Sequence, residues 1–161
     1  MRIPVVNVPE EKMDLPKHER SNILLVDDNK HGLQARRSVL EQAGFSVTTS
    51  NSAVQALEVF ASEKFDLVVT DFRMPGMDGI ELIAKLRETN ASLPIIMISG
   101  FTDTLGLTEQ NTGANMVLQK SANEASHLFR AGGRLLQAPA KPKAKSVGSA
   151  VRKKKAKAQG A

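Results

Sequence analysis

The chain has 161 residues, enough for one domain with a hydrophobic core and terminal extensions. It contains no cysteine, which excludes a disulfide framework and a thiolate metal site. The net charge of +5 is unevenly distributed, because residues 141–161 contain eight Lys or Arg and no acidic residue. Residues 1–140 carry 14 basic and 17 acidic side chains, a net charge of −3. The basic character therefore belongs to the C-terminal tail.

Residues 1–21 are charged, are interrupted by proline and show no sustained periodicity, which predicts a flexible N-terminal extension. They lack the apolar core of a secretory signal, and no apolar run in the chain is long enough to cross a membrane, so we expect a cytoplasmic protein. Residues 138–161 are mainly Ala, Lys, Pro, Gly and Ser, which predicts a disordered basic tail. The predicted folded domain occupies residues 22–137.

Short apolar runs alternate with helical patterns along this domain. The predicted strands are, in chain order, 23–26, 46–49, 65–70, 95–98 and 116–118. The predicted helices are 30–43, one capped by Ser52, 79–88, 102–110 and 123–137. Five strand–helix units in succession imply a parallel sheet with helices on both faces. Right-handed crossovers then give a doubly wound α/β fold.

Two of the predicted helices have features that the structure can test. Gly106 and Thr108 lower the helix propensity of residues 102–110, so this helix is expected to be weak. The last helix is expected to turn one apolar face toward the core, formed by Ala125, Leu128, Phe129, Leu135 and Leu136.

The third predicted strand ends on a carboxylate, Asp71, and a Met-Pro-Gly turn follows almost at once. In an open parallel sheet, ligand chemistry takes place just outside the carboxyl ends of the strands. Three other predicted strands also end in side chains that can take part in chemistry. The first is followed by Asp27 and Asp28, the fourth by Ser99 and the fifth by Lys120.

Each of these residues has an ordinary explanation when taken singly, as a helix cap, a turn residue or a solvated surface group. Together they indicate a site, because three converging carboxylates without partners would repel one another. Mg²⁺ prefers oxygen ligands and would relieve that repulsion. Lys120 supplies a positive charge for an anion, and Ser99 supplies a hydroxyl donor. The set predicts phosphoryl transfer to Asp71.

Four motifs occur in order: Ile-Leu-Leu-Val-Asp-Asp-Asn at 23–29, Val-Val-Thr-Asp-Phe-Arg-Met-Pro-Gly-Met-Asp-Gly at 68–79, Ile-Ile-Met-Ile-Ser-Gly at 95–100 and Val-Leu-Gln-Lys at 117–120. With these motifs, residues 22–137 resemble the receiver domain of response regulators in two-component signalling. The resemblance implies a flavodoxin-like fold with strand order 2-1-3-4-5.

The resemblance also implies roles for the acidic residues. Asp71 would be the phosphoacceptor, receiving its phosphoryl group from a histidine kinase or a phosphotransfer protein. Asp28 would bind Mg²⁺ directly together with Asp71, and Asp27 would bind it mainly through water. The backbone carbonyl of Arg73 would complete the protein ligands.

Two further roles follow from the resemblance, and two positions depart from the family pattern. Ser99 would move toward the phosphoryl group, and Lys120 would pair with it. Val117 stands where receivers commonly have Tyr or Phe, and Ser121 replaces the common proline. A cis peptide before Ser121 is therefore not expected, because it costs about 3 kcal/mol without proline.

The resemblance implies a stand-alone response regulator that switches its binding to an unknown downstream protein. It would form and hydrolyse its own aspartyl phosphate, and we expect no turnover of an external substrate. A second interpretation is a nucleic-acid-binding protein, in which the basic side chains from Lys141 to Lys157 bind phosphates without sequence preference under receiver control. A third is a phosphate sink. The tail could also serve only to keep the chain in solution, and membrane attachment is not expected because there is no cysteine to lipidate.

Overall fold

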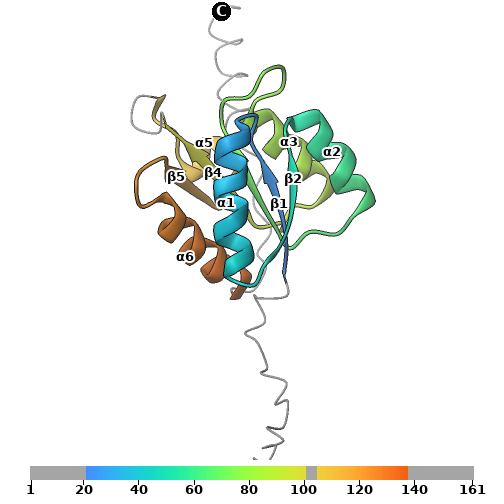
Figure 1. Ribbon diagram of the computed structural model, residues 1–161. Coiled ribbons are helices and arrows are strands. Elements are labelled where there is room, and N and C mark those ends of the chain that lie inside the picture. Colours follow the sequence, from blue (N-terminus) through green and yellow to red (C-terminus); the bar gives the residue numbers. More distant parts are fainter. Residues whose placement is uncertain (1–20, 101–104, 138–161) are drawn as a thin grey trace, which may run out of the picture.

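The structure is a computed structural model that describes residues 21–100 and 105–137 (Figure 1). The predictions for the N-terminal extension up to residue 20 and for the C-terminal tail lie outside these residues. The part of the chain that is described forms a five-stranded parallel sheet in the order β2-β1-β3-β4-β5. The strands are β1 Asn22–Val26, β2 Ser46–Ser50, β3 Leu67–Asp71, β4 Ile95–Ser99 and β5 Met116–Gln119.

Helices connect these strands and cover both faces of the sheet (Figure 1). They are α1 Lys30–Gln42, α2 Ala53–Ser62, α3 Gly79–Thr89, α5 Glu109–Thr112 and α6 Glu124–Gln137. The predicted doubly wound, flavodoxin-like fold with strand order 2-1-3-4-5 is therefore confirmed.

The core has two layers because successive strand residues point to opposite faces. On one face, Leu24 and Met97 pack with α2 and α3, while on the other Ile23 and Ile96 pack with α1 and α6. In β1, β3 and β4 residues on both faces are buried, and these strands are largely apolar, as is typical of parallel sheets.

Side-chain caps begin the helices that follow β1, β2 and β3. The Asn29 Oδ1 atom accepts hydrogen bonds from the backbone N–H groups of His31 and Gly32 at the start of α1. Ser52 caps α2, as predicted. Asp78 caps α3 and forms a capping box with Glu81. The β1–α1 turn and the start of α3 are thus fixed where they border the carboxyl edge of the sheet.

Two predictions about the helices are wrong in part. The helix predicted over 102–110 is absent at residues 106–108, because the chain turns at Gly106 with a φ of 61° and Thr108 serves as the N-cap of α5. On α6, Phe129 is 41% exposed although it was expected on the apolar face. The side of α6 that faces the sheet instead follows helical spacing through Leu128, Ala131, Gly132, Leu135 and Leu136.

Strand pairing aligns the ends of β1, β3, β4 and β5 at one edge. Val26 pairs with Thr70, Asp71 with Ile98, and Ser99 with Gln119. The residues that follow these positions therefore lie together at the carboxyl edge. Among the described helices, none is both long and apolar enough to cross a membrane.

Candidate functional site

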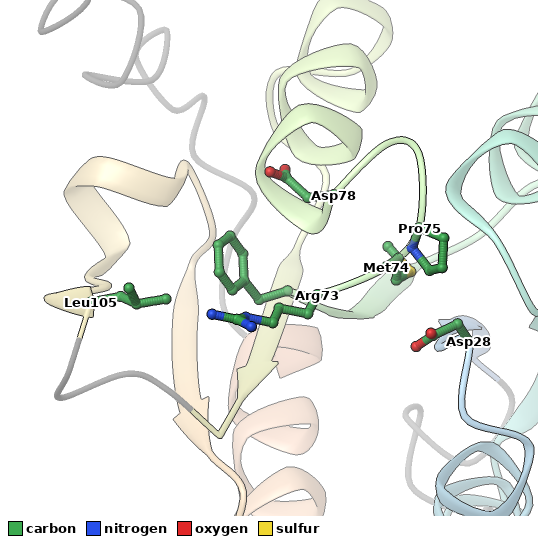
Figure 2. Close-up of a pocket in the computed structure, with 7 residues that line it drawn as sticks. Asp28, Arg73, Met74, Pro75, Asp78 and Leu105 are labelled. Carbon is green, nitrogen blue, oxygen red and sulfur yellow. The ribbon is translucent and has the colours of Figure 1, made fainter.

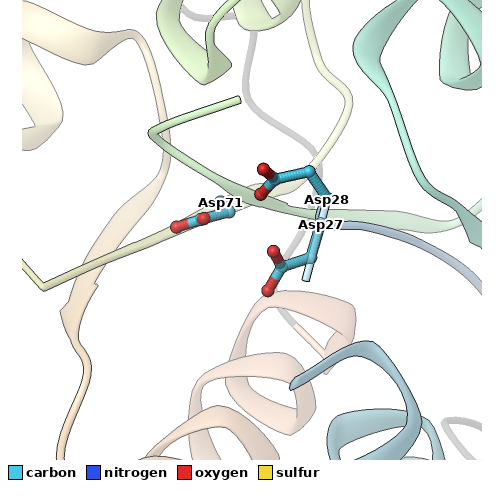
Figure 3. A group of neighbouring side chains, drawn as sticks. All are labelled: Asp27, Asp28 and Asp71. Carbon is cyan, nitrogen blue, oxygen red and sulfur yellow. The ribbon is translucent and has the colours of Figure 1, made fainter. Parts of the chain in front are cut away.

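Three carboxylates meet at the carboxyl edge of the sheet, as the sequence predicted. Asp27 and Asp28 come from the β1–α1 turn, and Asp71 is the last residue of β3 (Figure 3). One oxygen atom from each residue lies within 4.8 Å of the others. Asp27 and Asp71 are buried, whereas Asp28 is exposed to solvent.

Lys120 and Ser99 lie at the same edge. The Lys120 Nζ atom is 3.2 Å from the Asp71 Oδ1 atom, and the backbone N–H of Phe72 donates to the same oxygen at 2.9 Å. Ser99 is buried at the end of β4, and its backbone carbonyl accepts a hydrogen bond from the Lys120 N–H at 3.0 Å. The structure thus brings Lys120 into direct contact with Asp71 and places Ser99 at the neighbouring strand end.

The surroundings of Asp71 work against its ionised form. Burial raises the pKa of the Asp71 carboxyl above its ordinary value, and the negative charge of Asp27 raises it further. The charge and hydrogen bond of Lys120, together with the Phe72 N–H, lower that pKa without cancelling the rise. Lys120 therefore does not fully offset the effects of burial and of Asp27 on the Asp71 carboxyl, and three carboxylates in close proximity fit a hard, oxygen-preferring cation such as Mg²⁺.

Arg73 lies in the loop after β3, beside an open hollow of about 520 Å³ (Figure 2). Its side chain extends away from Asp28 (Figure 2). The proposed role of its backbone carbonyl as a metal ligand stays a prediction. The residues around the hollow are Asp28, Phe72, Arg73, Met74, Pro75, Asp78 and Leu105.

Gly79 brings the start of α3 against the end of β3. Its backbone N–H donates to the Phe72 carbonyl at 2.8 Å. A Cβ atom at this position would lie 2.2 Å from the Asp71 carbonyl oxygen and 3.0 Å from the Phe72 Cα atom. Glycine is therefore required here by close approach of the backbone to Asp71, which sequence reasoning had treated only as the beginning of a helix.

Two residues of the site were missed from the sequence. The buried Arg36 of α1 forms an ion pair with Asp27 through its Nη1 atom and a second one with Glu124 of α6 through its Nε atom. A signal for Arg36 was present, because it falls at helical spacing between Leu33 and Leu40 on the buried face of α1. A charged residue at a core position needs a partner of opposite charge.

The structure describes both positions that depart from the receiver pattern, Val117 and Ser121. Val117 is half-buried and packs against the core layer under α2 and α3. The peptide bond between Lys120 and Ser121 is trans, in agreement with the prediction from the missing proline. Ser121 is exposed.

The sequence profile of the response regulator receiver domain matches residues 23–130. The C4-dicarboxylate transport transcriptional regulatory protein DctD of Pseudomonas aeruginosa is 39% identical over 106 residues, covering 65% of this chain and 23% of DctD. The sensor protein EvgS of Escherichia coli K12 is 41% identical over 86 residues, covering 53% of this chain and 7% of EvgS. The chain thus spans less than a quarter of the length of these two relatives.

Solved structures of receivers superpose on the chain over most of its described part. The response regulator protein TrrA of Thermotoga maritima, in complex with Mg²⁺-BeF, gives a TM-score of 0.66 at 26% identity and covers 72% of this chain and 99% of its own. The chemotaxis response regulator CheY4 of Vibrio cholerae gives a TM-score of 0.65 at 27% identity and covers 71% and 98%. With its fold, its acidic cluster and this sequence match, the chain belongs to the response regulator receiver domain family of two-component signalling.

Proposed function

We propose that this receiver is phosphorylated on Asp71 by a histidine kinase or a phosphotransfer protein, and that the aspartyl phosphate switches its binding to a downstream protein. The observation that carries the proposal is the placement of Asp71 at the end of β3. Its Oδ1 atom is 3.2 Å from the Lys120 ammonium, and its carboxylate lies within the cluster formed with Asp27 and Asp28. A phosphoryl group on Asp71 would lie beside the Lys120 ammonium and the proposed metal site.

In the proposed reaction, a carboxylate oxygen of Asp71 attacks the phosphorus of a phosphohistidine. The P–N bond breaks, its electron pair leaves with the imidazole, and an acyl phosphate forms on Asp71. Lys120 neutralises charge on the transferred group, and the Ser99 hydroxyl donates to one of its oxygens. The contact of Lys120 with Asp71 and the place of Ser99 at the end of β4 support these proposed roles.

Magnesium fits this site by the chemistry of its donors. Asp28, Asp71 and the backbone carbonyl of Arg73 would hold the ion directly, and Asp27 would bind it mainly through water. When bound, Mg²⁺ supplies positive charge that offsets the carboxylates and the phosphoryl oxygens. The exposure of Asp28 leaves its carboxylate accessible to an ion from solvent.

Receiver domains are in general signalling modules, and we propose that this chain turns over no substrate beyond its own phosphoryl group. The reactions would be formation and hydrolysis of the aspartyl phosphate, in the cytoplasm. The nucleic-acid interpretation depends on the tail from Lys141 onward, which lies outside the described residues. The described residues supply no observation in favour of that interpretation or of a phosphate sink.

The proposal is tested by the intact mass of the protein after incubation with acetyl phosphate, with and without Mg²⁺. We expect a Mg²⁺-dependent gain of one phosphoryl mass that Asp71→Asn abolishes. Asp66→Asn is the matched control, because Asp66 is an exposed carboxylate just before the same strand begins. Full labelling of Asp71→Asn would refute the assignment of the phosphoacceptor.

A further inference from the structure

A network of charged side chains connects the acidic site to α6. Arg36 lies between Asp27 and Glu124 and binds both of them. The exposed fractions of the three side chains are 9% for Arg36, 0% for Asp27 and 15% for Glu124. Solvent therefore screens these interactions far less than it screens an ion pair on the surface.

The start of α1 leaves space for this charged network. Gly32 lies within the first turn of the helix, where glycine lowers helix stability. A Cβ atom at position 32 would lie 3.2 Å from the Asp27 Oδ2 atom and 3.4 Å from the Arg36 Nη1 atom. Those are the two atoms that form the ion pair. The glycine thus leaves the space in which Asp27 and Arg36 meet.

Both carboxylate oxygens of Asp27 are engaged by the protein. The Oδ1 atom accepts the Asn29 backbone N–H at 2.9 Å, and the Oδ2 atom binds Arg36. The position of the Asp27 carboxylate is therefore fixed, and Arg36 partly balances its charge. Asp28, by contrast, is exposed, and Asp71 pairs with Lys120. Any ligand that attracts Asp27 competes with Arg36 for it.

Arg36 in turn divides its charge between two carboxylates. Burial by itself would lower the pKa of the Arg36 guanidinium, but the hydrogen bonds and charges of Glu124 and Asp27 outweigh that effect and raise it. Arg36 therefore stays cationic, and a change at one partner alters its interaction with the other. Glu124 is the first residue of α6, so the second partner belongs to a different helix.

We infer that Arg36 is a positioning residue that couples cation binding at the acidic site to the first turn of α6. A bound cation attracts the Asp27 carboxylate, which weakens the contact between Asp27 and Arg36. The contact between Arg36 and Glu124 becomes stronger as a result. By reciprocity, the state of Glu124 sets the affinity of the site for the cation. The inference rests on the proposed function, because it requires the acidic cluster to bind Mg²⁺.

The test is a Mg²⁺ titration of the full-length ¹⁵N-labelled protein, without a phosphodonor, followed by amide chemical shifts. For Glu124→Gln we expect Mg²⁺ to bind about three- to tenfold more weakly, because Arg36 is left to Asp27 alone. For Arg36→Met we expect the opposite change, tighter binding by a similar factor, because Asp27 loses its competing cation. Opposite changes in affinity separate coupling from general destabilisation, which would weaken binding in both variants.

Arg37→Met is the matched control. Arg37 lies next in the same helix and pairs with Glu41, but both side chains are more than 40% exposed. Arg37→Met removes one positive charge, as Arg36→Met does, but leaves the buried charged network intact. We therefore expect the Mg²⁺ affinity to stay within about twofold of that of the parent protein. An increase in affinity equal to that of Arg36→Met would mean that net charge alone is responsible, and would overturn the inference.

The amides of α6 give a second measurement from the same titration. In the parent protein we expect the amides of Asp28 and Phe72 and those of residues 124–128 to shift with one midpoint. In Glu124→Gln the shifts at residues 125–128 should be largely lost while those near Asp28 persist. Persistent site shifts with no response in α6 of the parent protein would overturn the coupling alone, whereas no shift at Asp28 or Phe72 up to millimolar Mg²⁺ would overturn the proposed function as well.

Discussion

Two arginines, the buried Arg36 and the half-buried Arg87, lie at opposite edges of the sheet, and their partners differ in kind. Arg36, at the carboxyl edge, binds two carboxylates. Arg87, near the end of α3, lies at the amino edge and donates to neutral oxygens. Its acceptors are the backbone carbonyls of Ala91, Leu93 and Gly113 and the side-chain oxygen of Asn115.

The difference shows which edge can respond to a ligand. Burial lowers the pKa of Arg87, and its neutral partners only satisfy the donors of its guanidinium. These contacts join the segments before β4 and β5, whose carbonyls would otherwise lack that donor. The partners of Arg36 carry full charges that a bound cation can attract. We therefore interpret the amino edge as fixed structure and the carboxyl edge as the part that senses its ligands.

The largest expected effect is at Gly79, where the start of α3 lies closely against the end of β3. Gly79→Ala places a methyl group 2.2 Å from the Asp71 carbonyl oxygen, which forces α3 or the end of β3 to move. We expect a loss of about 3–4 kcal/mol in the free energy of unfolding and a loss of phosphorylation by acetyl phosphate. Urea unfolding followed by far-UV circular dichroism measures the first effect, since the chain has no Trp or Tyr.

Gly133→Ala is the control for this substitution. Gly133 lies inside α6, and a Cβ atom there would meet no atom within 4 Å. Alanine should therefore raise the stability by about 0.5–1 kcal/mol through its higher helix propensity. A Gly79→Ala protein as stable as the parent would contradict the close packing that we assign to the carboxyl edge.

The next effect is expected at Arg87. Arg87→Met keeps much of the apolar stem but removes the donors to Leu93, Gly113 and Asn115. We expect the free energy of unfolding to fall by about 2–3 kcal/mol, because partly buried acceptors lose their partner. The affinity for Mg²⁺ should stay unchanged. An affinity change as large as that of Arg36→Met would erase the distinction between the two edges.

Much of this architecture could be predicted from the sequence, because its signals are local. The apolar runs predicted the strands. Because the carboxyl ends of parallel strands share one edge of a sheet, the residues directly after the strands, such as Asp27 and Lys120, were expected at that edge. The strand order and the metal-binding roles came from the resemblance to receivers. Local patterns do not contain that information.

What the sequence did not reveal depends on distant contacts. Arg36 and Glu124 are 88 positions apart, and periodicity indicates which face of a helix is buried without naming its neighbour. The same limit explains Phe129, which is apolar but lies one residue beyond Leu128 on α6 and so turns away from the sheet. At Gly106 the low helix propensity was recognised, but propensity alone does not specify that this glycine adopts a positive φ and interrupts the helix.

The smallest effect is expected at Asp71 and has the opposite sign. Burial, followed by the charge of Asp27, raises the pKa of Asp71 in the folded protein above the value of about 3.9 in an unfolded chain. A carboxyl group with a raised pKa stabilises the fold fully below the unfolded value and loses that contribution as the pH rises through the folded one. Asp71→Asn should therefore raise the stability at pH 7 by about 1 kcal/mol, although it weakens the contact with Lys120.

This gain should shrink as the pH falls toward 4, since the parent protein then protonates Asp71, and it should also shrink when Mg²⁺ is added. Thermal unfolding followed by circular dichroism at several pH values measures both trends. Asp66→Asn, which changes an exposed carboxylate, should show neither. If Asp71→Asn instead lowered the stability at pH 7, the pairing with Lys120 would outweigh the burial of the Asp71 carboxylate and its repulsion from Asp27. The carboxylates at the carboxyl edge would then be stabilised by the protein without a metal ion. Asp71 would in that respect resemble the hydrogen-bonded groups around Arg87 at the amino edge.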